Sequence, residues 1–359
     1  MNPAPTKVDL LNLPPEELSL IVRDLGQPDY RARQLFSWLH RGAQFAEMTD
    51  LSRSLRERLA KIAAAGTLEL AAEETAADGA TKFGFRTNDG HLIETVFIPY
   101  SRRNTVCVSS QIGCAFRCRF CATGKQGLTR DLTAGEIVEQ VVRAQRASQP
   151  NRISNVVFMG MGEPLANYDS VLRAVRLINS PLGLAIGARH LAISTCGLPD
   201  QIRRLAGEGL QVALAISLHA ATNDVRSQLV PVNQTHPIAE VMAAARDYAS
   251  RTGRKVALQY VVVPGLNDTQ AQARRLVGLM KGLPCMVNLI PQNPSEGAGK
   301  AEALAAYRFA RLLKDKGLPV AVRKSRGAEV FGACGQLRSR TDLQEQRSAP
   351  HTREQGAPS

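Results

Sequence analysis

Apolar runs alternate with amphipathic segments along the chain from residue 104 onward. The apolar runs are NTVCVSS, NVVFMGMG, HLAISTCG, QVALAISLHA, KVALQYVVVPG and MVNLIPQN, and PVAVRKS closes the series. Apolar residues recur at helical spacing after each of the first six runs, and Thr133 with Glu136 forms a capping box before the first helix. Uninterrupted apolar strands separated by helices predict a parallel sheet buried on both faces. Six units are too few for an eight-unit barrel, so we expect an α/β fold with an open, partial parallel β/α barrel.

A different pattern occupies the first hundred residues. Helical spacing of apolar residues recurs between residues 14 and 64, and alternation around Asn88-Asp89-Gly90 predicts a β-hairpin. We therefore predict a small N-terminal helical domain with a β-hairpin over residues 1–99. The barrel core with a C-terminal cysteine segment follows over 100–337. The last stretch, 338–359, is polar and is expected to be disordered.

Polar and glycine-rich positions of the barrel gather where its predicted strands end. They are Gly160–Glu163, Ser194–Gly197, Ser217–His219 and Gln292–Asn293. In parallel α/β folds the carboxyl ends of the strands meet at one edge, where ligands bind. The sequence therefore predicts a ligand site at this edge.

Length, apolar content and cysteine usage set the class of protein. The chain has 359 residues, and 44% of them are hydrophobic, enough for a sizeable core. No apolar run approaches the ~20 residues of a membrane span, and the N-terminus does not resemble a signal peptide. We expect a cytoplasmic protein without membrane contact. Because disulfides are rare in the cytoplasm, the seven cysteines are better interpreted as metal ligands or reactive thiols than as a disulfide scaffold.

Charge is unevenly distributed along the chain. Residues 1–100 carry 11 Lys and Arg against 14 Asp and Glu, whereas the remainder carries 34 against 18. A basic excess confined to one part favours a polyanionic partner, although a solvated arginine-rich surface has the same composition. Basic residues surround two cysteine-bearing segments: Arg102, Arg103, Arg117, Arg119, Lys125 and Arg130 near the first, and Arg323, Lys324, Arg326, Arg338 and Arg340 near the second.

Three cysteines stand close together after the first predicted barrel strand. Cys114, Cys118 and Cys121 follow a CxxxCxxC spacing. Three thiolates on a short loop can hold three irons of a [4Fe–4S] cluster and leave the fourth iron open to a small chelating ligand. The alternative is a zinc site completed by a distant Cys or His, although zinc ribbons favour two separate CxxC pairs.

The cysteine spacing resembles that of the radical S-adenosylmethionine (SAM) superfamily, whose core is a partial barrel. Further motifs make the chain similar to the RlmN/Cfr family of RNA methyltransferases within that superfamily. They are VCVSSQIGCAFRCRFCATGKQG, VVFMGMGEPLANYD, ISTCG, ALAISLHA, NLIPQNP and RKSRGAEVFGACGQL, preceded by RDLGQPDYRARQLFSWLH in the N-terminal part. The resemblance covers about residues 8–338.

This resemblance implies a set of cofactors. Cys114, Cys118 and Cys121 would hold one [4Fe–4S] cluster, and SAM would chelate its open iron. The SAM-contacting positions of the family correspond to Gly162, Glu163, Ser194, Ser217, Leu218, His219 and Asn293. Two SAM molecules are used per turnover, and a donor such as flavodoxin or ferredoxin supplies the electron. A monomer is expected.

The resemblance also implies a reaction on an adenosine of 23S rRNA at the peptidyl-transferase centre and on an anticodon-loop adenosine of tRNA. Cys334 would take a methyl group from one SAM and become S-methylcysteine. A radical from a second SAM would remove hydrogen from that group, which then adds to carbon 2 of the adenine. Cys107 would resolve the protein–RNA adduct through a transient disulfide with Cys334. Glu94 matches the proton acceptor, although the sequence leaves open whether Glu94 or Cys107 takes the adenine proton.

Two alternatives stay open at this point. One is the Cfr-type reaction at carbon 8 of the same rRNA adenosine, and the other is a zinc-dependent RNA-binding protein without radical chemistry. Family members commonly read DIDAACGQL before the methyl-carrying cysteine, whereas this chain reads EVFGACGQL, which bears on substrate range more than on chemistry. Cys196 and Cys285 match no family role and are expected to pack in the core.

Overall fold

The computed structural model describes residues 7–292, 300–324 and 326–337. Its main feature is a ten-stranded sheet with the order β14-β13-β12-β11-β10-β9-β6-β5-β4-β3. Seven strands run parallel: β6 (Arg103–Val108), β9 (Asn155–Phe158), β10 (Leu191–Thr195), β11 (Ala213–Ser217), β12 (Val256–Val262), β13 (Cys285–Pro291) and β14 (Val320–Val322). Among the described strands, β14 and β3 stand at opposite ends of the order, so the barrel is open. The predicted fold class is confirmed.

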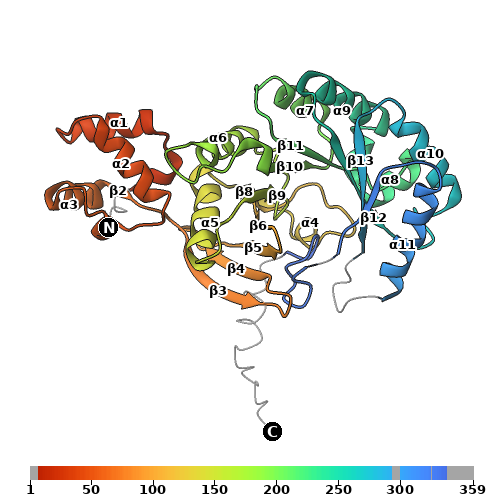
Figure 1. The fold of residues 1–359 in the computed structure, drawn as a ribbon, viewed down its shortest axis with the longest axis horizontal. Helices are drawn as coiled ribbons and strands as arrows, with labels where there is room; N and C mark the ends of the chain where they lie inside the picture. Colours follow the sequence, from red (N-terminus) through yellow and green to blue (C-terminus); the bar gives the residue numbers. More distant parts are fainter. Residues whose placement is uncertain (1–6, 293–299, 325, 338–359) are drawn as a thin grey trace, which may run out of the picture.

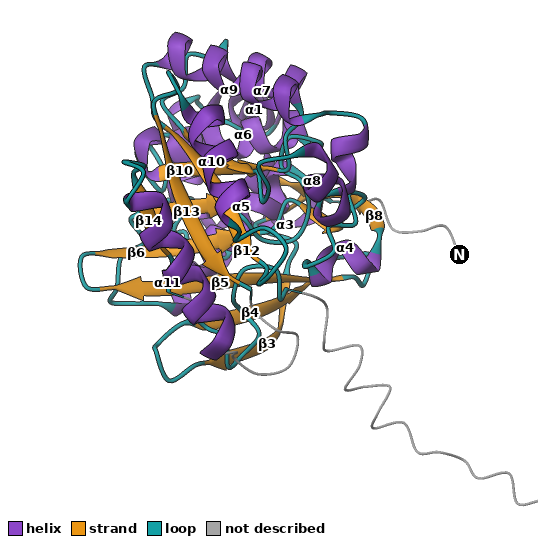
Figure 2. Ribbon diagram, turned by 90° about the vertical axis from the view of Figure 1, so that its right-hand side faces the viewer, coloured by secondary structure: helices purple, strands orange, loops and turns teal. Residues whose placement is uncertain are grey.

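Helices connect the parallel strands and cover the outer side of the curved sheet (Figures 1 and 2). They are α5 (Ala134–Ala147), α6 (Tyr168–Asn179), α7 (Pro199–Ala206), α9 (Ile238–Thr252), α10 (Gln270–Met280) and α11 (Lys300–Lys314). The capping box is present at α5: the Thr133 hydroxyl accepts from Glu136 N at 3.1 Å, and the Glu136 carboxylate accepts from Thr133 N at 2.9 Å. The sequence pattern did not indicate the short helix α8 (Asn223–Leu229), which lies between β11 and α9.

The predicted hairpin is formed by β4 (Thr81–Arg86) and β5 (Leu92–Tyr100). A further strand, β3 (Glu69–Thr75), pairs with β4, and β5 pairs antiparallel with β6. The hairpin therefore continues the sheet of the barrel and places Val96 opposite Cys107. The domain boundary after residue 99 stays a prediction.

Three helices form the N-terminal part at one end of the molecule (Figure 1): α1 (Pro15–Asp24), α2 (Tyr30–Leu39) and α3 (Arg53–Ile62). Beside them the short strands β1 (Val8–Asp9) and β2 (Ala63–Ala64) pair in parallel. Helix α5 joins this part to the barrel, because the Glu139 carboxylate accepts from the amides of Thr67 and Leu68 at 2.6 and 2.9 Å. None of the helices in the described part of the chain has the length and apolar character to cross a membrane.

Candidate active site

The loop that carries three cysteines is closed at its base by a small antiparallel pair. Strand β7 (Gln111–Gly113) pairs with β8 (Leu128–Asp131), and Cys114 N donates to Gly127 O at 2.7 Å. Gly113 has a φ of +76°, and a Cβ at this position would lie 1.8 Å from Gly127 O, so only glycine fits. Helix α4 (Ala122–Gln126) begins directly after Cys121. We refer to residues 114–121 as the cysteine loop.

The thiols of the cysteine loop are partly buried and close to one another. Burial, with smaller effects of neighbouring thiols and Glu163, raises the pKa of Cys114 and of Cys118 to about 12. A bound positive centre would be needed to keep such thiols deprotonated near neutral pH. Among the described residues, no three His, Cys, Asp or Glu side chains converge as ligands of one metal ion. Three thiols on one short loop that line one cavity are a ligand set that a [4Fe–4S] cluster can take.

Residues 326–337 form a C-terminal segment that lies against the cysteine loop. Ala122 N donates to Gly335 O at 2.8 Å. The Thr123 hydroxyl donates to Leu337 O at 2.7 Å, and these two residues are 214 positions apart in the sequence. The contacts place Cys334 beside the cysteine loop, which sequence spacing alone could not indicate.

A cavity opens between the cysteine loop and the carboxyl ends of the parallel strands. It holds about 860 Å³ of empty space, part of which is open to solvent. All three cysteines of the loop line it, and Cys334 lines it from the C-terminal segment. We call this space the cysteine-loop cavity.

Most of the residues predicted to contact SAM lie at the cysteine-loop cavity. Gly162, Ser194, Ser217 and His219 line it. Glu163 and Leu218 are buried beside these residues and do not border the cavity. Asn293 lies outside the described residues. Gly162 has a φ of +100°, and a Cβ there would lie 2.6 Å from the Gln111 side chain, so this approach requires glycine.

His219 contributes a neutral imidazole to the cavity. Its Nδ1 accepts from Val261 N at 2.9 Å, which leaves the ring proton on Nε2. Burial, with a smaller effect of the Arg226 charge, lowers the pKa of His219 to about 3. The ring meets Phe120 of the cysteine loop edge-on, with 4.6 Å between the centroids. His219 therefore offers a hydrogen-bond donor without a positive charge.

The Glu163 carboxylate is engaged by backbone amides. Oε2 accepts from Cys196 N at 2.7 Å, and Oε1 accepts from Leu165 N at 3.0 Å. Burial raises the pKa of this carboxyl despite these bonds. Glu163 thus ties the loop after β9 to the end of β10. Its predicted contact with SAM stays a prediction.

Gln259 also lines the cavity, and sequence reasoning missed it. The residue is 4% exposed, and no described residue donates a hydrogen bond to its Oε1. A buried carbonyl oxygen without a donor costs free energy, so this atom fits a ligand that brings an N–H or O–H group. SAM carries such groups at both of its ends, and the cavity therefore fits SAM. A single Gln in an apolar strand gives no periodic signal, and only the pairing of β12 with β11 places it opposite Ser217.

Cys196 packs in an apolar cluster, as expected, and it also has neighbours that the sequence did not indicate. Instead of packing only in the core, it borders the cavity, where its thiol lies near Glu163, Cys118 and Cys114. Burial raises its pKa well above the ordinary value. A fourth cysteine therefore stands beside the three of the loop.

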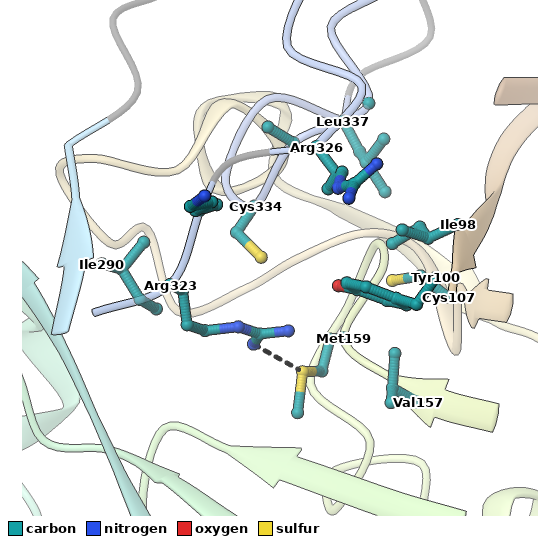
Figure 3. Close-up of a pocket in the computed structure, with 13 residues that line it drawn as sticks. Ile98, Tyr100, Cys107, Val157, Met159, Ile290, Arg323, Arg326, Cys334 and Leu337 are labelled. Atoms are coloured by element: carbon teal, nitrogen blue, oxygen red, sulfur yellow. Dashed lines mark hydrogen bonds between the residues drawn. The ribbon is translucent and has the colours of Figure 1, made fainter. Parts of the chain in front are cut away.

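Cys107 and Cys334, the two cysteines predicted to be catalytic, line a second, smaller pocket (Figure 3). Cys107 on β6 is buried, Cys334 is exposed, and the sulfur atoms of both face this pocket. Four residues line both the pocket and the cysteine-loop cavity: Met159, Ile290, Arg323 and Cys334. Cys334 therefore stands where the two spaces meet.

Arg323 places a positive charge near the sulfur atoms of Cys107 and Cys334. Its guanidinium extends into the pocket (Figure 3), with Nη1 3.8 Å from Met159 Sδ. The neighbouring Cys334 thiol is the main cause that raises the pKa of Arg323. Burial raises the pKa of Cys107 to about 12, the Cys334 thiol adds to this rise, and Arg323 opposes it. The pocket thus favours a negative charge near Arg323.

Glu94 lies on β5 beside the pocket without bordering it. It is 5% exposed, and its carboxylate lies 3.4 Å from Lys82 Nζ. Ile98 and Tyr100, on the same face of β5, do line the pocket. The structure thus brings Cys107 and Cys334 to one pocket, whereas Glu94 does not line it.

Comparison with known proteins gives the class of this barrel first. The model of the radical SAM superfamily matches residues 108–277, which contain the cysteine loop. The crystal structure of a radical SAM methyltransferase from Sphaerobacter thermophilus has a TM-score of 0.89 and 46% identity, and covers 92% of this chain and 99% of that chain. The barrel and its cysteine loop therefore define a radical SAM enzyme, a class that uses a [4Fe–4S] cluster and SAM.

The N-terminal part and the curated relatives then give the family. The model of the ribosomal RNA large subunit methyltransferase N-terminal domain matches residues 8–65. The dual-specificity RNA methyltransferase RlmN of Anaeromyxobacter dehalogenans is 46% identical over 92% of this chain and 91% of its own length. The protein of the same name from Marinobacter nauticus is 44% identical over 97% of both chains. This chain belongs to the RlmN family of radical SAM RNA methyltransferases, which disfavours the Cfr-type and zinc-binding alternatives.

Proposed function

We propose that this chain methylates carbon 2 of an adenosine in 23S rRNA and in tRNA, with Cys334 as the carrier of the methyl group. The observation that carries the proposal is the shared pocket: Cys107 and Cys334 line one space, and Cys334 also borders the cysteine-loop cavity. Relatives named for dual specificity support the two RNA substrates. When bound, the cluster and SAM would supply a methyl group and a 5′-deoxyadenosyl radical.

Each cysteine has surroundings that suit its proposed step. Cys334 is exposed, so with SAM bound its thiolate could attack the sulfonium methyl group: the new S–CH₃ bond would form as the bond from the sulfonium sulfur to that methyl breaks, and S-adenosylhomocysteine would leave. In the later step, the Cys107 thiolate attacks the Cys334 sulfur and forms a disulfide. The bond from sulfur to the transferred carbon breaks, and its electron pair stays with the methylated adenine, which takes a proton. Glu94 is the proposed acceptor of the adenine proton.

RNA would approach the pocket over a basic rim. Exposed basic side chains occur in the segments that surround it: Arg102, Arg103, Arg117, Arg119, Lys125 and Lys324. The adenosine must leave its stack to reach the pocket. Arg130 contributes less than the sequence indicated, because the carboxylates of Asp89 and Glu136 hold it at 2.6 and 2.8 Å. Arg338 and Arg340 lie outside the described residues.

Mass spectrometry of the product nucleosides tests the proposed function. Anaerobically reconstituted protein, given SAM, a reductant and 23S rRNA fragments or tRNA, should form 2-methyladenosine. Cys334→Ala should abolish methylation and keep the iron, whereas Cys285→Ala, a buried control at the start of β13, should remain active. Formation of 8-methyladenosine, or full turnover by Cys334→Ala, would overturn the proposal.

The resolving role of Cys107 has its own test. Among the described residues, Cys107 and Cys334 are the two cysteines that line this pocket. Cys107→Ala removes the thiol that would attack Cys334, so the methylene bridge between Cys334 and RNA should stay uncleaved. A denaturing gel should then show protein covalently attached to RNA. Cys107→Ala that turns over freely, with no such band, would rule out this role.

A further inference from the structure

Arg226 on α8 is a fully buried arginine whose hydrogen-bond partners are all neutral. Its exposed fraction is 0%. The guanidinium donates to Cys196 O at 2.5 Å and to Asn233 Oδ1 at 3.0 Å, and further to His236 O, Leu218 O and Ser217 O. No carboxylate of the described residues forms an ion pair with it. Sequence reasoning did not single out this residue.

A buried charge of this kind needs an opposite charge nearby. Carbonyl dipoles offset part of the cost of desolvation, but an unpaired buried ion remains unfavourable. Arginine does not escape this cost by losing its proton. A negative group is therefore expected close to Arg226.

The cysteine loop is close to Arg226. Cys196, whose carbonyl accepts from Arg226, lines the cysteine-loop cavity. Helix α8 contacts the loop through Arg119 N, which donates to Leu229 O at 3.0 Å, and Cys118 packs in the same apolar cluster as Leu229. The Glu163 carboxylate lies on the other side of Cys196, bonded to its amide. Cys196 therefore lies between Arg226 and the cysteine-loop cavity.

We propose that the fixed positive charge of Arg226 favours reduction of the iron–sulfur cluster held by the cysteine loop. This inference rests on the proposed cluster-binding role of Cys114, Cys118 and Cys121. Reduction takes one electron from a low-potential one-electron donor, breaks no bond, and makes the cluster with its thiolates more negative by one charge. A nearby positive charge stabilises the product of this step more than the reactant. The hydrogen bonds of Arg226 keep that charge in place.

The test is a redox titration of the reconstituted full chain with dithionite, followed by electron paramagnetic resonance. Arg226→Gln removes the charge. Asn233→Asp keeps Arg226 and the hydrogen bond that its guanidinium donates to residue 233, but replaces the neutral amide there with a carboxylate of nearly the same shape. Both variants should make reduction about tenfold less favourable, which lowers the midpoint potential by about 59 mV.

Three further variants separate charge from structure. Arg226→Lys keeps a positive charge with fewer hydrogen bonds and should stay within about twofold of the unmodified chain in the equilibrium constant for reduction. Asn233→Ala removes all the side-chain bonds of Asn233, including the one from Arg226 that Asn233→Asp keeps, without adding a charge. It should also stay within about twofold of the unmodified chain. Arg173→Gln removes a partly exposed charge that pairs with Glu17 of α1, far along the chain from the cysteine loop, and should leave the potential unchanged.

The proposal is overturned if Arg226→Gln and Asn233→Asp, with full iron content, titrate like the unmodified chain. It also fails if Arg226→Lys and Asn233→Ala lower the potential as much as their charge-changing counterparts, because structure would then be the cause. Should Arg226→Gln fail to fold, the comparison of Asn233→Asp with Asn233→Ala decides alone. Absence of a four-iron cluster from the unmodified chain would instead refute the proposed function.

Discussion

At the scale of single residues, backbone amides fix two polar side chains at or beside the cavity. Glu163 accepts from two amides, and His219 accepts from a third. These side chains are held in one orientation before any ligand binds, which reduces the entropy that binding costs. Gln259 differs, because its buried oxygen has no donor among the described residues.

Gln259→Leu should weaken the binding of SAM. The variant keeps an apolar side chain of similar size and removes the acceptor, and loss of one hydrogen bond of about 1 kcal/mol corresponds to a dissociation constant about fivefold higher. Equilibrium binding to the reconstituted chain measures this change. Gln228→Leu, on the exposed side of α8, is the matched control and should bind normally. Equal affinities of the two variants would show that Gln259 Oε1 does not meet the ligand.

At the scale of elements, two contacts between distant segments matter most for the site. The C-terminal segment is fixed to α4, and the N-terminal part is fixed to α5. Neither contact follows from local pattern, since each joins segments far apart in sequence. Each can be loosened by a single change.

Thr123→Val should loosen the C-terminal segment. It removes the bond from the Thr123 hydroxyl to Leu337 O and leaves that buried carbonyl without this donor, at a cost of about 1–2 kcal/mol. We expect faster proteolytic cleavage near Cys334 and a lower rate of methylation at unchanged iron content. Thr75→Val, on the exposed strand β3, serves as control. The contact is unimportant if both variants are cleaved at the same rate.

Asp9 should make the joint between the N-terminal part and α5 sensitive to pH. Burial, with a smaller effect of Glu139, raises the pKa of Asp9 to about 7. Because the folded pKa lies above the unfolded one, the protonated carboxyl stabilises the fold below about pH 4, and this contribution is lost as the pH rises to about 7.

Asp9→Asn should therefore gain stability relative to the unmodified chain as the pH rises from 5 to 8, by about 2 kcal/mol. The variant keeps the oxygen that accepts from Leu11 N. Thermal unfolding at several pH values measures the difference. Asp169→Asn, at a largely exposed ion pair with Arg204, should show no such trend. A constant difference between Asp9→Asn and the unmodified chain would contradict the assignment.

At the scale of the whole molecule, the barrel could be predicted because each of its units is local. Continuous apolar strands, helical spacing and the capping box at Thr133 are read from a few neighbouring residues, and so is the spacing of Cys114, Cys118 and Cys121. The continuation of the sheet into β5, the approach of Cys334 to Cys107, and the place of Cys196 depend on pairing between remote segments. Gln259 and Arg226 are single polar residues in an apolar strand and a short helix, and no periodicity marks them.

Binding of RNA should depend steeply on salt. If the basic rim contacts about six phosphates, affinity should fall by about 10³-fold over a fourfold rise in salt concentration. Arg119→Gln, in the cysteine loop, should reduce the slope by about one contact. Arg23→Gln, which removes an exposed charge on α1, should leave the slope unchanged. Equal slopes for all three proteins would place the RNA elsewhere.

The most direct test of the account concerns the fourth iron of the cluster. Electron–nuclear double resonance of the reduced, reconstituted chain with SAM labelled at its amino nitrogen and carboxylate oxygens would report what binds there. We predict couplings to both labels, and the same couplings in Cys196→Ala, because three cysteines leave one iron to SAM. Absent couplings in the unmodified chain, together with their appearance in Cys196→Ala, would show that a fourth cysteine holds that iron and would contradict the account.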